Sequence, residues 1–140
     1  MFEELSDPRG GPLGLEVVRT LHQLVLQVYR LTEKYPAEER FGLVAQLRRA
    51  AASIPANIIE GRNRHSTKEF VHQLYIARGS LAETHYHLLL SRDLGYVNET
   101  DYAGISAEYE RAGQLLGGLI RSLQRPGRHP EPRDPEPRTP

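Results

Sequence analysis

The stretch at residues 41–64 restricts the fold most, because two helical patterns run along it side by side. One pattern is apolar or small and recurs at steps of three and four, as on the buried face of a helix. Its members are Leu43, Leu47, Ala50, Ile54, Ile58 and Gly61. The other pattern is polar and has the same steps, so it forms a second line on the same helix. Its members are Gln46, Arg49, Ser53, Asn57 and Glu60.

Pro55 lies in the middle of this predicted helix. Proline has no N–H to donate and its ring crowds the carbonyl four residues earlier, so we expect a kink or an unpaired carbonyl at Ala51. A polar line and an internal proline both cost stability. We therefore expect neighbouring helices to cover this segment.

Three further stretches have helical periodicity. The first, residues 15–35, ends before Pro36 and has two adjacent apolar stripes, whereas one bundle core needs only one. The stripes are Val17, Leu21, Leu24, Val28 and Leu31, and Val18, His22, Val25 and Tyr29. We expect Glu38 and Glu39 in the first turn of the second helix, where carboxylates suit the helix dipole.

The last two helices have clear starts. Ser66 and Glu69 form a capping box before the third helix, and Asn98 is expected to cap the fourth. The core stripe of the third helix is Phe70, Leu74, Ala77, Leu81 and Leu88. The fourth helix has a heptad seam of Tyr102, Ile105, Tyr109, Ala112, Leu116, Leu119 and Leu123. Short connections between four helices predict an all-α, up-down-up-down four-helix bundle over residues 15–124.

The two ends of the chain have the composition of loose segments. Residues 1–14 are expected to be a flexible N-terminal arm, and residues 125–140, rich in proline and arginine, a disordered tail. The N-terminal sequence is acidic and lacks the apolar core of a signal peptide, and no apolar run is long enough to span a bilayer. We therefore expect a cytoplasmic protein without membrane contact.

Several motifs within residues 41–83 occur in the order seen in one known family. They are GLVAQLRRAAASIPANIIEG, Arg64, Ser66, the pair Glu69-Phe70, and IARGSLAE. In these motifs the chain resembles the four-helix-bundle proteins of ribosomal-RNA intervening sequences, although Ile59 stands where the family typically has alanine. The resemblance implies a homopentamer. It also implies a distant relation to variability determinant proteins that assist the reverse transcriptase of a retroelement.

The polar line is expected to meet the third helix. We predict that Arg49 forms a buried ion pair with Glu83, that Ser53 and Asn57 satisfy backbone released by Pro55, and that the set is a structural network. The network consists of Gln46, Arg49, Ser53, Asn57, Glu60, Ser80 and Glu83. The alternative is an enzyme pocket made by Arg49, Asn57, Glu60 and Glu83. No nucleophile lies beside a base, so no catalytic residue is assigned.

The net charge of the 140-residue chain is zero, with 18 basic and 18 acidic residues, but residues 40–68 hold six basic side chains and one acid. This segment predicts a patch that contacts phosphate groups of RNA or DNA. Its members are Arg48, Arg62, Arg64, His65 and Lys68. No interleaved aromatic residues accompany it. A reverse transcriptase as the partner is implied by the family resemblance alone. The alternative is a protein-binding adaptor without nucleic-acid contact.

The surplus stripe on the first helix and the glycines of the fourth predict a homo-oligomer. The expected interface residues are Val18, Val25, Tyr29, Gly113 and Gly117. Cysteine is absent, and His85 and His87 are two residues apart and point to opposite sides of a helix. We therefore expect no cofactor and no metal site. The function expected from the sequence is that of a non-enzymatic, oligomeric scaffold or accessory protein.

Overall fold

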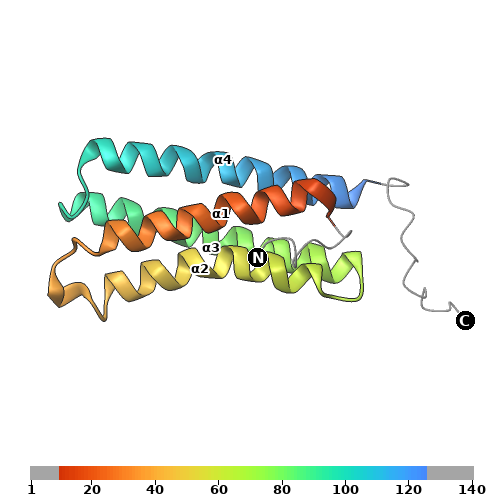
Figure 1. The fold of residues 1–140 in the computed structure, drawn as a ribbon, viewed down its shortest axis with the longest axis horizontal. Helices are drawn as coiled ribbons and strands as arrows, with labels where there is room; N and C mark the ends of the chain where they lie inside the picture. Colours follow the sequence, from red (N-terminus) through yellow and green to blue (C-terminus); the bar gives the residue numbers. More distant parts are fainter. Residues whose placement is uncertain (1–9, 126–140) are drawn as a thin grey trace, which may run out of the picture.

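Four helices run up, down, up and down along one axis (Figure 1). They are α1 (Gly11–Thr32), α2 (Leu43–Arg62), α3 (Thr67–Asp93) and α4 (Glu99–Gln124), and a short 3-10 helix, η2 (Ala37–Glu39), precedes α2. This computed structural model describes residues 10–125. Most of the expected arm and tail lies outside this range, and within it there is no strand. The four-helix bundle is as expected from the sequence.

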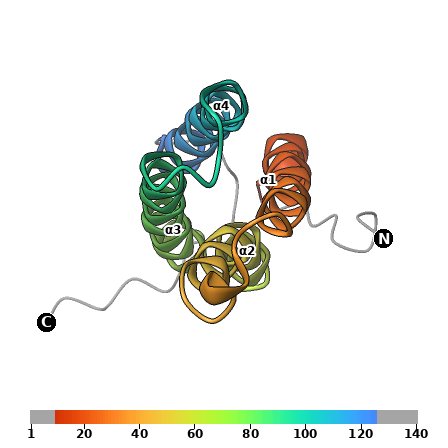
Figure 2. The same ribbon diagram turned by 90° about the vertical axis from the view of Figure 1, so that its left-hand side faces the viewer.

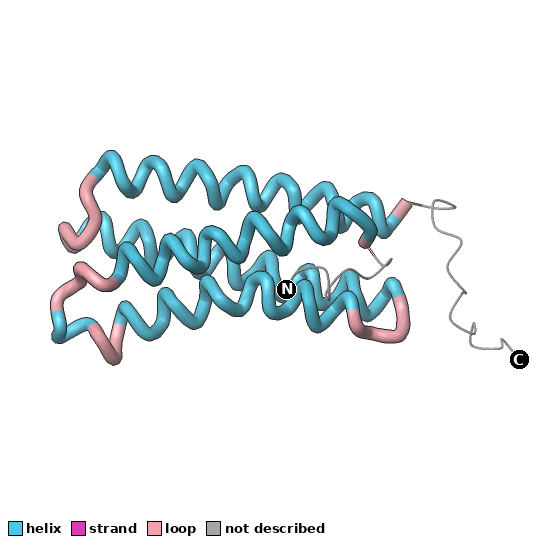
Figure 3. Tube along the Cα trace, viewed as in Figure 1, coloured by secondary structure: helices cyan, strands magenta, loops and turns pink. Residues whose placement is uncertain are grey.

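The helices occupy the corners of a square when viewed along the axis (Figure 2). Each helix packs against its two neighbours, and the α2–α3 contact is the most extensive. Short loops join the helices at alternating ends (Figure 3). The start of α1, the α2–α3 turn and the end of α4 therefore lie together at one end of the bundle.

The predicted stripes form the core. The apolar stripe of α2 and the core stripe of α3 are buried, and so is the seam of α4 apart from the half-buried Tyr102. Fully burying each leucine, isoleucine or phenylalanine of these stripes stabilises the fold by about 1.5–3 kcal/mol. No helix within residues 10–125 combines the length and the hydropathy needed to cross a membrane.

The predicted caps are also present. The Ser66 hydroxyl accepts a hydrogen bond from the Glu69 amide at 3.1 Å, and the Asn98 side chain accepts one from the Asp101 amide at 2.7 Å. Each bond satisfies a first-turn amide that has no partner within the helix. These local signals place the starts of α3 and α4 at the expected residues.

The boundaries of α1 differ from expectation. The helix begins at Gly11, not at residue 15, because Gly10 takes a left-handed conformation (φ 82°) and Pro12 suits a first turn. It ends at Thr32, and Tyr35 turns back so that its ring lies 5.3 Å from that of Tyr96. The second stripe also behaves differently: Val18 is fully buried in the core, so it is not a surface residue.

The start of α2 is a second difference. Glu38 and Glu39 lie in η2 and not in the first turn of α2. Gly42 has φ −106° and ψ −108°, far from helical values, and it separates the two helices. The α-helix then continues through the buried Pro55 to Arg62.

A candidate nucleic-acid interface at one end of the bundle

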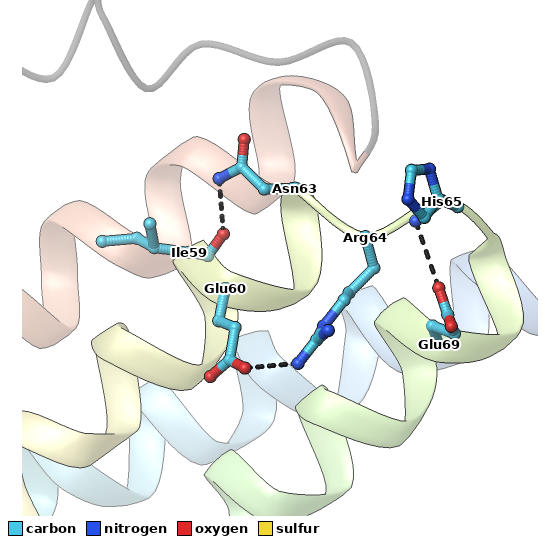
Figure 4. A network of polar contacts seen from close by, with 6 residues as sticks. All are labelled: Ile59, Glu60, Asn63, Arg64, His65 and Glu69. Atoms are coloured by element: carbon cyan, nitrogen blue, oxygen red, sulfur yellow. Dashed lines mark hydrogen bonds and ion pairs between the residues drawn. The ribbon is translucent and has the colours of Figure 1, made fainter.

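The α2–α3 turn is held in shape by contacts among its own residues (Figure 4). Glu60 forms an ion pair with Arg64, and Glu69 accepts a hydrogen bond from the His65 amide at 3.1 Å. The Asn63 side chain donates to the Ile59 carbonyl at 2.9 Å, which caps the end of α2. The turn is therefore a defined platform for its basic side chains.

Three of the five predicted contact residues lie exposed on this platform. They are Arg64, His65 and Lys68. Arg62 is only 3% exposed, so its charge is directed into the protein and not towards a ligand at the surface. The structure thus removes Arg62 from the predicted patch.

The prediction is also wrong for Arg48. This residue lies at the opposite end of the bundle and binds the C-terminal end of α1. Its Nε donates to the Thr32 hydroxyl at 2.8 Å, and one Nη donates to the Tyr29 carbonyl at 3.2 Å. Its guanidinium also lies 4.5 Å from the centroid of the Tyr29 ring. A cation that binds the last carbonyls of a helix stabilises that helix end. Arg48 is therefore a structural clamp.

The tertiary structure adds basic residues that sequence analysis missed. The end of α4 lies beside α3, where Gln124 donates to the Tyr75 hydroxyl at 3.4 Å. Arg78 lies 4.7 Å from the Tyr75 ring centroid, so an exposed aromatic ring is present among the cations, contrary to expectation. We call the exposed cations of this region the basic end: Arg64, Lys68, Arg78, Arg121 and Arg125.

Among residues 10–125, three carboxylates belong to the segments at the same end: Glu16, Glu60 and Glu69. The five exposed cations therefore outnumber the acids, although the whole chain is neutral. The alternating direction of the helices could have predicted this cluster from the sequence. It predicts that basic residues near the ends of α2 and α4 meet at one end of the bundle.

The predicted polar network does not form as a buried set. Arg49 and Glu83 are both exposed, and the described residues include no ion pair between them. Glu83 instead lies 3.4 Å from Nε2 of His87, one turn further along α3. The prediction of a buried Arg49–Glu83 pair is wrong because the rotation of α2 directs Arg49 to solvent.

The other members of the polar line contact their own helix or solvent. The Ser53 hydroxyl donates to the Ala50 carbonyl at 2.9 Å, and the Asn57 amide donates to the Ser53 carbonyl at 2.7 Å. Neither binds the carbonyl of Ala51, which Pro55 leaves without its usual partner. Gln46 is exposed, Ser80 is half-buried, and Glu60 pairs with Arg64. These contacts do not converge on a pocket of the kind that an enzyme requires.

Two titratable groups are in contact between α3 and α4, the half-buried His85 and the buried Tyr109. The rings of His85 and Tyr109 are in edge contact, with centroids 5.8 Å apart. Burial lowers the pKa of His85, partly offset by the charge of Glu110, and burial raises the pKa of Tyr109. Both effects favour the neutral forms. Among residues 10–125 no three His, Asp or Glu side chains are placed to hold a metal ion.

The glycines of α4 are not sites of close helix approach within the bundle. A Cβ at Gly113 would lie 3.7 Å from Leu81, an ordinary contact, and one at Gly117 would meet only the Arg121 guanidinium at 3.3 Å. The close approach occurs at Gly61, where a Cβ would lie 2.8 Å from atoms of Phe70 and Gln73. Val25 is partly buried against the core, and Tyr29 is exposed beneath Arg48.

The chain matches one protein family and is similar to a solved structure. Residues 14–118 match the 23S rRNA-intervening sequence protein family. A crystal structure from Bacteroides thetaiotaomicron, described as a protein of unknown function from the S23 ribosomal protein family, is 25% identical with a TM-score of 0.72. The match covers 78% of this chain and 98% of the other. No curated protein matches the chain.

Proposed function

This chain belongs to the 23S rRNA-intervening sequence protein family, and we propose that it is a cytoplasmic, non-enzymatic, oligomeric accessory protein. In this proposal the basic end holds a nucleic acid, or an enzyme that acts on one, such as a reverse transcriptase. The observation that carries the proposal is the convergence of exposed cations from the α2–α3 turn, α3 and the end of α4 on one end of a neutral protein. Such a local excess of positive charge attracts polyanions.

The expected mode of binding is contact with the phosphate backbone. Arginine and lysine neutralise phosphates without reading the sequence of bases. The exposed ring of Tyr75 adds a surface on which a base of a single strand can stack. We therefore expect single-stranded nucleic acid to bind with little sequence preference.

Salt dependence of binding tests this proposal. Fluorescence anisotropy with labelled single-stranded RNA should show an affinity that falls steeply between about 50 and 200 mM salt. The variant Lys68→Gln/Arg121→Gln should bind more weakly and with a smaller salt slope, by about 0.7 for each phosphate that is no longer neutralised. The matched control is Arg30→Gln/Lys34→Gln at the opposite end. Equal binding by both variants would overturn the proposal.

A protein-binding adaptor is the second candidate, and it is favoured by one observation at the opposite end. Phe41, in the connection between α1 and α2, is 88% exposed, and Leu94 in the α3–α4 turn is also exposed. Exposed apolar side chains at a tip favour docking to another protein. Such docking should persist at high salt and be lost in Phe41→Ser, whereas binding to phosphates should show the reverse pattern.

The oligomer is also a proposal, with its interface moved from the predicted residues of α1 and α4 to α3. The outward face of α3 carries Gly79, Ala82 and Tyr86, all exposed and spaced by steps of three and four. Tyr86 is 59% exposed, although the opposite face of α3 already fills the core. A helix that is apolar on both faces needs a second partner. A ring of subunits would supply one, and the number five rests only on the family resemblance.

A further inference from the structure

A groove of about 500 Å³ lies between the C-terminal part of α1 and the N-terminal part of α4. It is at the end of the bundle opposite the basic end (Figure 1). Its floor is apolar, because Leu31 is half-buried and Ile105 is 6% exposed. A groove with an apolar floor and charged walls suits a chain segment that combines apolar and charged groups.

The two walls of this groove have opposite charges. The residues that define them are Arg30 and Lys34 on the basic wall, at the end of α1, and Asp101 and Glu108 on the acidic wall, on α4. Glu33 is an exception on the basic wall. Among residues 10–125 no ion pair joins the two walls, although Gln27 donates a hydrogen bond across the groove to Glu108 at 2.9 Å. Charges of both signs are therefore available to an occupant of the groove.

A segment with the same mixture of charges follows α4 in the sequence, beyond residues 10–125. It reads PEPRDPEPR, in which the motif Pro-Glu-Pro-Arg occurs twice, at residues 130–133 and 135–138. Prolines favour the polyproline II conformation, which has three residues per turn. Residues two positions apart then point in directions about 120° apart, so the glutamate and the arginine of one motif face different sides. Such a motif suits a groove with one acidic and one basic wall.

The end of α4 indicates where this segment can reach. Arg125 has an extended backbone (φ −70°, ψ 126°), and Pro126-Gly127 follows it. Proline followed by glycine is typical of the middle of a type II turn, which reverses the direction of the chain. Glu108 lies about 26 Å before Arg125 along α4, at about 1.5 Å per residue. A polyproline II segment covers this distance in about 8 residues, so the second motif can reach the groove.

We propose that the second motif, residues 135–138, docks in the groove between α1 and α4 of its own chain. Arg138 pairs with the acidic wall, Glu136 pairs with the basic wall, and the proline rings contact the apolar floor. An exposed ion pair is weak by itself, but the connection to α4 gives the motif a high effective concentration at the groove. The inference goes beyond the proposed function, because the docking requires no nucleic acid.

Paramagnetic relaxation measured by NMR in the full chain tests this docking. The sequence has no cysteine, so Thr139→Cys provides a single position for a nitroxide label. The label should broaden the amide signals of Leu31 and Gly104 in the groove and leave that of Gly79, on the outward face of α3, unchanged. At about 1 M salt, where the Debye length is about 3 Å, the broadening should be lost.

Charge reversal supplies the matched controls. Arg138→Glu in the labelled chain should remove the broadening at Gly104, because the motif then presents a second acid to the acidic wall. Asp101→Arg, added to that variant, should restore the broadening. Equal broadening in all three chains would show that the label adheres to the surface without the ion pair, and it would overturn the inference. The absence of broadening in the groove of the first chain would do the same.

A mixed sample identifies the chain that supplies the motif. Isotope-labelled protein without the nitroxide is combined with spin-labelled protein without the isotope, so only contacts between different chains cause broadening. We expect none in the groove. Broadening there would assign the groove to the motif of a second copy and refute docking within one chain. Since no sample contains RNA, the proposed nucleic-acid binding stands or falls separately.

Discussion

Arg48 and Arg49 are adjacent in the sequence but have different roles. Arg48 binds the Thr32 hydroxyl and the Tyr29 carbonyl, whereas Arg49 is exposed. We predict that Arg48→Ala lowers the free energy of unfolding by about 1–2 kcal/mol, because the end of α1 loses two hydrogen bonds and a cation. Arg49→Ala should change it by less than about 0.5 kcal/mol. Urea denaturation at low protein concentration measures both, and equal losses would contradict the assignment of Arg48 as a clamp.

The half-buried His85 should make the stability of the folded protein depend on pH. Burial lowers the pKa of His85 in the folded protein, so the unfolded state binds the proton more readily. Stability is therefore greatest above the unfolded pKa of about 6.5 and is lost as the pH falls through it. We expect His85→Leu to flatten the curve of thermal midpoint against pH between about 7 and 5. If the variant and the parent lose stability in parallel over this range, the histidine is not the cause.

At the scale of the helices, Gly61 allows α2 and α3 to pack closely. A Cβ at this position would lie 2.8 Å from both Phe70 and Gln73, closer than atoms in contact can be. We predict that Gly61→Ala destabilises the bundle by about 1–3 kcal/mol through overpacking, despite the higher helix propensity of alanine. Gly104→Ala on α4 is the control.

The control variant Gly104→Ala should change the free energy of unfolding in the opposite direction. No atom lies within 4 Å of a Cβ at Gly104, so alanine there should stabilise the protein by up to about 1 kcal/mol. Thermal or urea unfolding of both variants compares the two effects. A stabilised Gly61→Ala variant would show that α2 and α3 separate easily, which the structure does not predict.

At the scale of the whole molecule, the exposed apolar face of α3 predicts self-association. The variant Tyr86→Glu should reduce the mass found by sedimentation equilibrium to that of a monomer, while circular dichroism remains helical. Val18→Asp should instead unfold the protein, because Val18 is fully buried and an unpaired charge in a core is costly. A monomeric parent protein at micromolar concentration would refute the oligomer without affecting the fold.

The basic end is also a property of the whole molecule. Its cations come from the α2–α3 turn, from the first half of α3 and from the end of α4. The end of α4 is far from the other two segments in the sequence. Up-down topology brings the two helix ends together, so a neutral chain gains a positive end. The proposed nucleic-acid binding depends on this arrangement.

Local and periodic signals determined much of the fold. The caps at Ser66 and Asn98, the seam of α4 and the apolar stripe of α2 could all be read from the sequence, because each depends on residues within a few positions of one another. The family could also be recognised from the ordered motifs around α2 and α3. These signals define which segments are helical and which broad face of each is buried.

Tertiary packing decided which residue of a helix meets which partner. Successive residues of a helix differ by about 100° in direction. The rotation of a helix about its own axis therefore decides which side chain contacts a neighbouring helix and which is exposed to solvent. That rotation directs Arg48 to α1, Arg49 to solvent and Val18 into the core, and it results from the packing of all four helices at once.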